Sequence, residues 1–378
     1  MPKNIVICCD GTGNQIGDAH SNVIKLYRVL RKTQKQIVYY DPGVGTLESH
    51  DDWGVISQNI KVYAGLGFGY GLDNNVIGAY KFLIENYVDG DDIYLFGFSR
   101  GAYSVRVLAG FINSIGLLTK HQLNLCDFAY TAYKKISNES SFENVRLFEK
   151  VLRPNRIPIR FLGIWDTVST VIVPRKDRLY IPKLSQLAYT QKNPSIKQVR
   201  HALSIDERRS MFRPYLWQEN QEYWGSPFEP SNPEPQDVVQ MWFSGVHSDI
   251  GGGYAESESG LSKLTLHWML EEIPETLLVN KRSANEIVEG KPVKGREKSY
   301  APPDPAAKQH DELESTFWKL QEFFPKKVSR REWNDRKSLF GLYIPRAEPR
   351  FIPSGALIHP SVHERIAKVK GYDPENLP

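Results

Sequence analysis

The segment Ile93–Tyr103 holds a serine in a setting that suits nucleophilic catalysis. Its residues Gly97-Phe98-Ser99-Arg100-Gly101 match the G-x-S-x-G nucleophile elbow, in which a strand turns sharply into a helix and presents the serine oxygen. A strand-like run, Ile93–Phe98, precedes the serine. Apolar residues at helical spacing follow it at Val105, Leu108, Ala109 and Ile112. Side chains at 97 and 101 would clash where strand and helix meet, so we predict that glycine is required at both positions. The order of strand, turn and helix predicts that Ser99 is the nucleophile.

A serine hydroxyl becomes an effective nucleophile only when a base takes its proton and a carboxylate orients that base. After a nucleophile elbow the partners follow in the order Ser, Asp, His, each just past the carboxyl end of a strand. Asp166 directly follows the strand-like run Arg160–Ile164, and His247 follows Val238–Phe243. The sequence therefore predicts a catalytic triad of Ser99, Asp166 and His247.

Other histidines compete for the role of the base. His201 lies in Val199–Arg209, which we predict to be helical and structural, while His359 and His363 flank a proline turn near the C-terminus. Only His247 combines a position at a strand end with a glycine run, Gly251–Gly253, that lets the backbone approach a ligand closely. A structural histidine stays the alternative interpretation at each of these positions.

Cleavage of an ester also needs hydrogen-bond donors for the charge that develops on the carbonyl oxygen. The backbone N–H of Arg100, the residue after the nucleophile, is the first predicted donor. The second is expected from the turn after the first strand, at Gly11 or Thr12. Asp10, which precedes this turn, is predicted to brace it by accepting backbone hydrogen bonds.

Alternating strand-like and helical patterns in the first 120 residues position these side chains. Short apolar runs at Ile5–Cys9, Ile37–Tyr40 and Ile93–Phe98 read as strands, and Val23–Leu30 and Val76–Tyr87 read as helices. Strands that are apolar on both faces belong inside a sheet covered by helices. The sequence therefore predicts an α/β fold with a mostly parallel sheet and helices on both faces.

The whole chain, residues 1–378, is predicted to form one domain with an inserted lid over residues 168–236. Aromatic residues of this insertion, Tyr215, Trp217 and Trp224, are expected to pack the lid and are candidates for substrate binding. The polar, proline-containing stretch 281–308 is predicted to be a mobile surface loop.

Composition limits the classes of partner. The formal charge of +4, from 48 basic and 44 acidic residues, gives no global field for nucleic acid. We predict the densest basic cluster, Lys326-Lys327 with Arg330-Arg331, to be a solvated helix face, with contact to an anionic surface as the alternative. Cys8, Cys9 and Cys126 are expected to be buried free thiols in a reducing compartment. No apolar run is long enough for a membrane span or a signal-peptide core.

Six ordered motifs together resemble one known family. They are Asp10–Asn14, Gly43–Thr46, Leu95–Tyr103, Gly163–Val168, His201–Arg208 and Gly245–Tyr254. The chain resembles the uncharacterised α/β-hydrolase family related to the catalytic domain of type VI secretion phospholipase effectors, over about residues 4–270. The resemblance implies an α/β-hydrolase fold, a triad at Ser99, Asp166 and His247, and esterase, lipase or phospholipase-like activity.

The expected protein is thus a serine ester hydrolase that needs no cofactor and no metal. Its substrate is a small-molecule or lipid ester; we expect no nucleic-acid partner, and a transient contact with a membrane surface and the oligomeric state stay open. A cytoplasmic location is the default, with export by a signal-less secretion route as the other option. One alternative is a metal-dependent phosphohydrolase that uses Asp10 as nucleophile, with Asp166, His247 and Asp249 as ligands. Another is a non-catalytic binding module on a hydrolase scaffold.

Overall fold

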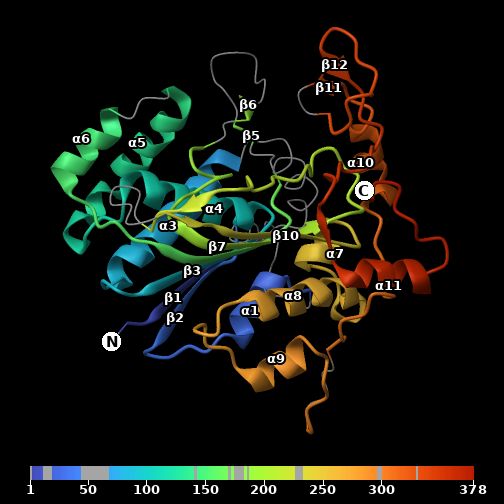
Figure 1. Cartoon of the computed structure of the whole chain (residues 1–378), viewed down its shortest axis with the longest axis horizontal. Coiled ribbons are helices and arrows are strands. Elements are labelled where there is room, and N and C mark those ends of the chain that lie inside the picture. Colours follow the sequence, from blue (N-terminus) through green and yellow to red (C-terminus); the bar gives the residue numbers. More distant parts are fainter. Residues whose placement is uncertain are drawn as a thin grey trace, which may run out of the picture.

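The computed structural model describes residues 2–11, 19–43, 68–139, 143–168, 172–173, 183–184, 187–225, 233–295, 300–328 and 331–378. Its centre is a seven-stranded sheet in the order β13-β10-β7-β4-β3-β1-β2 (Figure 1). Every neighbouring pair in this sheet is parallel. The strands are β1 (Asn4–Cys9), β2 (Gln36–Asp41), β3 (Asp92–Phe98), β4 (Ile159–Trp165), β7 (Ile196–Ser204), β10 (Asp237–Phe243) and β13 (Leu357–Ile358). The predicted α/β class with a parallel sheet is confirmed.

Helices cover both faces of the sheet, because the central strands send apolar side chains to both sides. In β1, Ile5, Ile7 and Cys9 enter one core cluster, and Val6 and Cys8 enter the other. The first cluster is completed by α3 (Phe68–Asn86), α4 (Arg100–Ile115) and α5 (Cys126–Glu139). The second is completed by α1 (Asn22–Val29), α8 (Gly260–Glu272) and α9 (Lys281–Ile287), which lie below the sheet in Figure 1. All three cysteines are buried and free, as predicted.

The strand order reverses at β1, which lies between β2 and β3. In open parallel sheets the crevice at the carboxyl ends of the strands on either side of such a reversal is where ligands bind. Ser99 follows β3 and Gly11 follows β1, so both lie at this edge. The topology thus brings the predicted nucleophile and the predicted oxyanion turn to one place.

Smaller elements complete the described chain. They are α6 (Glu143–Leu152), α7 (His247–Gly251), α10 (Thr316–Gln321) and α11 (Pro360–Lys368), with the short antiparallel pairs β5 (Ile172–Val173) and β6 (Lys183–Leu184), β8 (Glu222–Tyr223) and β9 (Glu234–Pro235), and β11 (Lys326–Lys327) and β12 (Leu342–Tyr343). Short 3-10 turns span Lys120–Leu125, Glu256–Glu258 and Glu312–Glu314. None of the helices in the described ranges is long and apolar enough to cross a bilayer.

The two glycines of the elbow are required by contacts between backbones. A Cβ atom on Gly97 would lie 2.5 Å from the Gly101 carbonyl oxygen, and one on Gly101 would lie 2.0 Å from the Cys9 carbonyl oxygen. Neither backbone atom can move aside as a flexible side chain could. The start of α4 therefore packs directly against the ends of β3 and β1.

The prediction of a helix over Val199–Arg209 is wrong, because Ile196–Ser204 forms β7 between β4 and β10. Both faces of this central strand are buried, so its polar side chains take tertiary partners and the sequence shows no alternation. Arg200, for example, pairs with Asp237 at 2.9 Å and with Glu272 at 2.5 Å. Helical spacing was therefore a misleading signal here.

Three other predicted segments can be compared with the structure. The predicted lid, 168–236, contains β7, which belongs to the main sheet and therefore not to a lid. The parts of this segment that lie outside the described residues are 169–171, 174–182, 185–186 and 226–232. A lid role for the rest stays a prediction. The predicted loop 281–308 begins with the helix α9, and its mobility also stays a prediction. Lys326 and Lys327 lie in β11, so the predicted helix face is wrong at these two residues of the basic cluster; Arg330 lies outside the described residues.

We predict that Gly101→Ala lowers the free energy of unfolding by roughly 3 kcal/mol, since the new methyl group meets fixed backbone. Gly78→Ala is the matched control: its Cβ would lie 3.1 Å from the Tyr39 hydroxyl, a side-chain atom, inside helix α3. Urea denaturation of both variants measures the difference. Equal stability of the two would contradict the close packing at the elbow.

Candidate active site

The predicted nucleophile elbow has a strained backbone at Ser99. Ser99 separates β3 from α4 and has φ 56° and ψ −119°, a region that non-glycine residues rarely adopt. Two backbone hydrogen bonds hold it there: the Ser99 N–H donates to the Trp165 carbonyl at 3.1 Å, and the Tyr103 N–H donates to the Ser99 carbonyl at 3.2 Å. The surrounding fold therefore stabilises the strained residue.

The three side chains of the predicted triad lie together at the carboxyl edge of the sheet. Ser99 Oγ lies 2.8 Å from His247 Nε2, and His247 Nδ1 lies 2.5 Å from Asp166 Oδ2. Each residue directly follows or nearly follows a strand: Ser99 comes after β3, Asp166 after β4, and His247 after β10 at the start of α7. The structure thus joins residues that are 148 and 81 positions apart in the sequence.

The imidazole of His247 is held by packing as well as by hydrogen bonds. The centre of its ring lies 4.7 Å from the ring centre of Phe98 and 4.9 Å from the ring centre of Phe212. The His247 backbone N–H donates to Glu207 Oε2 at 3.2 Å, and Glu207 in turn pairs with Arg209 at 2.7 Å. His247 is therefore fixed in one orientation between Ser99 and Asp166.

Asp166 is fully buried, and Arg350 compensates its charge. The guanidinium binds both carboxylate oxygens, with Nη1 2.6 Å from Oδ1 and Nη2 2.9 Å from Oδ2. The Ser204 backbone N–H donates to Oδ1 at 3.1 Å. Burial alone would raise the pKa of Asp166, but the charge of Arg350 and the hydrogen bonds from His247 and Arg350 outweigh it and hold this pKa well below its usual range.

Arg350 was not identified from the sequence. It lies 184 positions after Asp166, outside any helix or strand, and belongs to none of the six motifs. Besides the carboxylate it binds the carbonyl oxygens of Ser204 at 3.0 Å and Phe212 at 2.5 Å. Only the folded chain reveals a fully buried arginine with this set of acceptors.

The predicted oxyanion donors differ in their surroundings. Arg100 is the first residue of α4, so its N–H has no acceptor within the helix. The Gly11 N–H donates to Asp10 Oδ1 at 2.7 Å and is occupied by that contact. Thr12 lies outside the described residues. The oxyanion role of all three stays a prediction.

Asp10 braces the turn after β1, as its sequence position predicts. Its carboxylate accepts hydrogen bonds from the Gly11 N–H, the Ser21 hydroxyl and, at 2.9 Å, the Tyr40 hydroxyl. Within the described part of the chain, no three His, Cys, Asp or Glu side chains are grouped so that they could hold a metal ion. Nothing in this arrangement favours the alternative in which Asp10 is the nucleophile of a phosphohydrolase.

The rival histidine and the predicted substrate-binding aromatics lie elsewhere. His201 is buried in β7, where its Nε2 accepts a hydrogen bond from the Thr167 N–H at 3.3 Å; burial and the charge of Arg106 lower its pKa well below the usual value. Tyr215 and Trp217 are buried in the first core cluster, and Arg106 stacks over both rings. Trp224 is 39% exposed and donates to Glu222. Substrate binding by the three aromatics stays a prediction.

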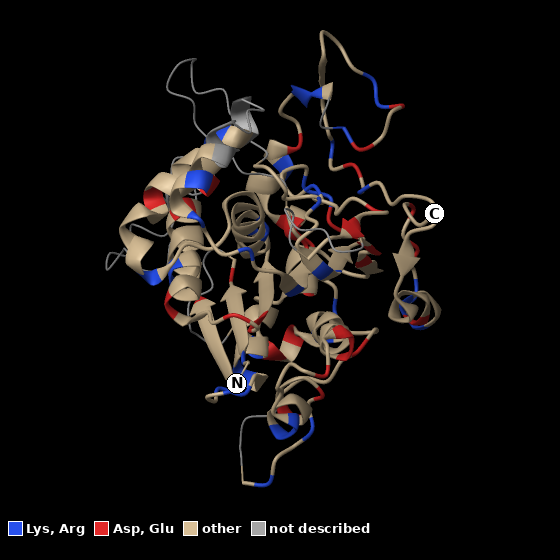
Figure 2. Cartoon of the chain, turned by 60° about the vertical axis from the view of Figure 1, so that its left-hand side comes forward, with Lys and Arg blue, Asp and Glu red and all other residues tan. Residues whose placement is uncertain are grey.

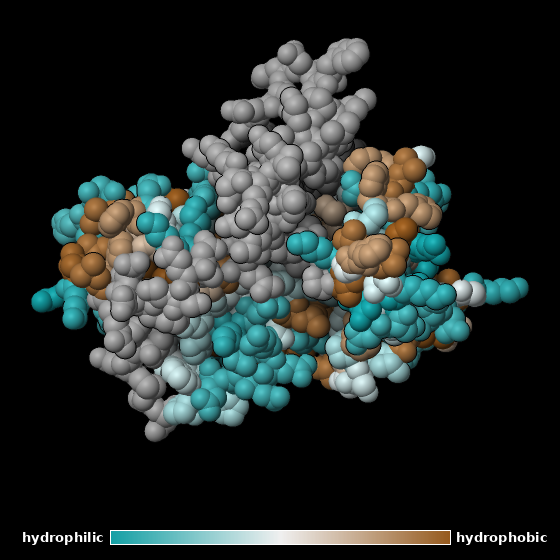
Figure 3. Space-filling view, turned by 90° about the horizontal axis from the view of Figure 1, so that it is seen from above, coloured by the Kyte–Doolittle hydropathy of each residue, from teal (hydrophilic) through white to brown (hydrophobic). Residues whose placement is uncertain are grey.

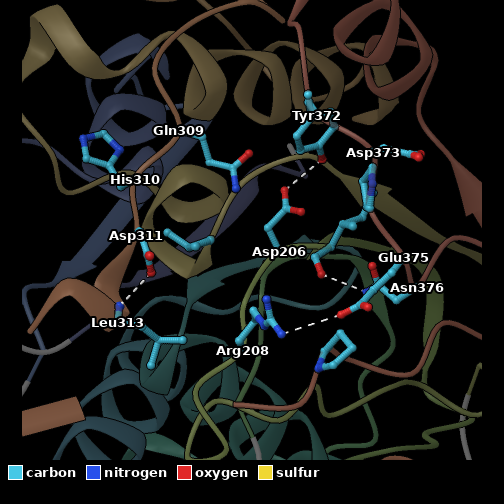
Figure 4. A pocket seen from close by; sticks show the side chains of 15 residues that line it. Asp206, Arg208, Gln309, His310, Asp311, Leu313, Tyr372, Asp373, Glu375 and Asn376 are labelled. Carbon is cyan, nitrogen blue, oxygen red and sulfur yellow. Dashed lines mark hydrogen bonds and ion pairs between the residues drawn. The ribbon is translucent and has the colours of Figure 1, made fainter. Parts of the chain in front are cut away.

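A pocket of about 590 Å³ opens beside the residue that precedes His247 and helix α7. Figure 4 shows Asp206 facing Tyr372 and Arg208 facing Glu375 across it. Asp206 accepts hydrogen bonds from the Gly245 N–H at 2.6 Å and the Tyr372 hydroxyl at 2.9 Å. Burial raises the pKa of Asp206 to about 6. The pocket adjoins Val246, but Ser99 and His247 do not line it.

Comparison with known proteins gives one family match. Residues 3–272 match the family model described as the catalytic domain of the Tle1-like phospholipase effector of the type VI secretion system. The match confirms the resemblance read from the six motifs. An uncharacterised protein of Saccharomyces cerevisiae is 28% identical over 394 residues, and the match covers 71% of this chain and 56% of that protein. The chain thus spans little more than half the length of this curated relative.

Two solved structures are similar at low identity. One is the crystal structure of an uncharacterised protein from Pseudomonas aeruginosa, with 18% identity and a TM-score of 0.39, covering 72% of this chain and 45% of that one. The other is the Tle1 effector bound to the VgrG spike of the type VI secretion system, with 20% identity and a TM-score of 0.33 over 69% of this chain and 52% of that one.

We predict that Arg350→Met lowers the free energy of unfolding by about 3–5 kcal/mol, because it leaves the buried Asp166 carboxylate without its counter-charge. The double variant Asp166→Asn with Arg350→Met should lose less than the two single variants added together. Urea denaturation at neutral pH measures this coupling. Strict additivity would contradict a direct dependence of one charge on the other.

The raised pKa of Asp206 predicts a pH dependence of stability. The folded state holds the proton more tightly than the unfolded chain, whose aspartate pKa is about 3.9. The free energy of unfolding of the native chain should therefore fall, relative to Asp206→Asn, as pH rises from about 4 to about 6. Urea denaturation across this range measures it, with Asp311→Asn in the same pocket as the control. A relative gain for the native chain over the same window would contradict the assignment.

Proposed function

Because the chain belongs to the family of the Tle1-like type VI secretion phospholipase effector catalytic domain, we propose that it is a serine hydrolase that cleaves the carboxylic ester bonds of lipids. The observation that supports this most is the continuous hydrogen-bonded series from Ser99 through His247 to Asp166 at the carboxyl edge of the sheet. Acyl transfer requires a nucleophile, a base and an orienting carboxylate in such a series, so this geometry supports the proposal.

In the proposed reaction His247 acts first as base and then as acid. Its Nδ1–H donates to Asp166, so Nε2 carries a lone pair toward Ser99. As Ser99 Oγ attacks the ester carbonyl carbon, its proton passes to Nε2, and the same proton then leaves with the alkoxide when the C–O bond breaks. Water, deprotonated by Nε2, attacks the acyl-enzyme, and the acid leaves as Ser99 regains its proton.

Asp166 must stay ionised through this cycle to stabilise the imidazolium that forms. The low pKa of its carboxyl group, maintained by Arg350, supports that role. Arg350 has no contact with the reacting atoms, so we assign it as a positioning residue. Its two hydrogen bonds fix the plane of the carboxylate and hence the direction of Oδ2 toward His247.

The proposed oxyanion hole combines the Arg100 N–H with a donor from the turn after β1. Gly11 and Thr12 are the residues that the sequence predicts for this second donor, and the occupied Gly11 amide favours Thr12. We propose that the chain forms one domain and that the parts of 168–236 on either side of β7 form its lid. Tyr215, Trp217 and Trp224 are retained as its packing and substrate-binding aromatics, of which Trp224 is the most accessible.

Ser99→Ala should lower the turnover of p-nitrophenyl esters by a factor of about 10⁴ or more, since it removes the hydroxyl that forms the proposed acyl-enzyme. A fluorophosphonate probe should label the native chain and not this variant. Ser104→Ala, one turn further along α4, is the matched control and should keep the label. Full ester cleavage by Ser99→Ala would end the proposal.

His247→Gln should abolish turnover, whereas His201→Gln should retain it, because His247 contacts the Ser99 hydroxyl and His201 contacts Arg106, Thr167 and Gln240 instead. The measurement is kcat on the same ester, with thermal melting to verify that both variants fold. The opposite pattern would make His201 the base and would overturn the assignment.

A further inference from the structure

The C-terminal arm, residues 316–346, exposes an unusual amount of apolar surface. Eight of the fifteen exposed large hydrophobic residues in the described chain belong to it: Phe317, Leu320, Phe323, Phe324, Leu339, Phe340, Leu342 and Ile344. Phe340 is 94% exposed. Single exposed hydrophobic residues are ordinary, but a concentration of this kind marks an interaction surface.

Backbone hydrogen bonds place the two halves of the arm side by side. Strand β11 pairs with β12, the Val328 N–H donates to the Gly341 carbonyl at 2.9 Å, and the Arg346 N–H donates to the Glu322 carbonyl at 2.9 Å. Figure 1 shows β11 and β12 projecting from the body of the molecule above α10. In the view from above, brown atoms gather on the right, the side on which Figure 1 draws β11 and β12, and a second group lies on the left (Figure 3).

The arm also has a net positive charge. Residues 316–346 contain 8 basic and 3 acidic residues, a net +5, whereas the whole chain has a net +4. Lys319, Lys327, Lys337 and Arg346 are exposed among the apolar side chains, and Figure 2 shows basic residues along the projecting hairpin. Glu322, one of the three acids, is buried and accepts hydrogen bonds from Ser210.

The base of the arm is fixed close to the candidate active site. The buried ring of Trp318 lies 5.5 Å from the ring of Phe212, which itself lies 4.9 Å from His247. Glu322 Oε1 accepts from both the backbone N–H and the hydroxyl of Ser210 at 2.8 Å. Because these contacts connect α10 to the core, whatever binds the arm is held beside the carboxyl edge of the sheet.

We propose that this arm docks the chain on an anionic lipid surface, with Phe323, Phe324 and Phe340 entering the boundary between headgroups and acyl chains and the lysines meeting lipid phosphates. Exposed aromatic residues interleaved with cations on a projecting hairpin suit such an interface, since one end of each contact is apolar and the other is charged. The inference rests on the proposed function and extends it, because docking of the arm would bring the proposed triad close to the ester bonds of a bilayer.

Binding is tested on the full chain carrying Ser99→Ala, so that the vesicles stay intact. Co-sedimentation should show binding to phosphatidylcholine vesicles that contain phosphatidylglycerol, and at least tenfold weaker binding to phosphatidylcholine alone. The triple variants Phe323→Ser/Phe324→Ser/Phe340→Ser and Lys319→Gln/Lys327→Gln/Lys337→Gln should each weaken binding at least tenfold. Val88→Ser/Phe128→Ser/Val151→Ser removes three exposed apolar residues outside the arm and should bind normally.

The inference would be overturned if the Ser99→Ala chain did not bind vesicles, or if the two arm variants bound them as tightly as that chain does. It would also be overturned if gel filtration showed that the arm variants change the oligomeric state, since the arm would then be an interface between copies. Its failure is separable from failure of the proposed function. Soluble p-nitrophenyl esters test the triad without a membrane, whereas the ratio of vesicle-phospholipid to soluble-ester turnover tests the arm. The arm variants should lower that ratio at least tenfold.

Discussion

The ion pair between Arg350 and Asp166 is the interaction on which the site depends. A carboxylate without solvent access would ordinarily take up a proton or leave the interior, and either change would release His247. The guanidinium prevents both by binding the two oxygens, and the Ser204 amide occupies Oδ1 further. The hydrogen bond from His247 then falls on Oδ2, which directs Nε2 at Ser99.

The same edge of the sheet stores conformational strain. Ser99 and Asp166 both have positive φ, at 56° and 35°, and neither is a glycine. Such residues persist only where their surroundings determine them. Around Ser99 the close approach of Gly97, Gly101 and the Cys9 carbonyl leaves no alternative path for the chain. A rigid core of two apolar clusters thus holds Ser99, the proposed nucleophile, in a conformation that the local sequence alone would not adopt.

The family match ends at residue 272, and residues after it also contribute to the candidate site. Arg350 comes from this region, and so does the arm of residues 316–346 with its exposed phenylalanines and lysines. One segment therefore completes the electrostatics of the candidate site, and another offers a surface beside it. Both reach the site through buried contacts, Arg350 through Asp166 and the arm through Trp318 and Phe212.

Local signals in the sequence determined the parallel sheet, the elbow at Ser99 and the strand-end positions of Asp166 and His247. Short apolar runs, glycine pairs and turns are recognisable because they follow from steric constraints between residues that are close in the sequence. Strand β7 escaped this kind of inference, since a strand buried on both faces satisfies polar side chains such as Arg200 through distant partners. Tertiary structure alone decided the role of Arg350 and the exposure of the arm. Both depend on which residues meet although they are far apart in the sequence, and no periodicity or spacing encodes that.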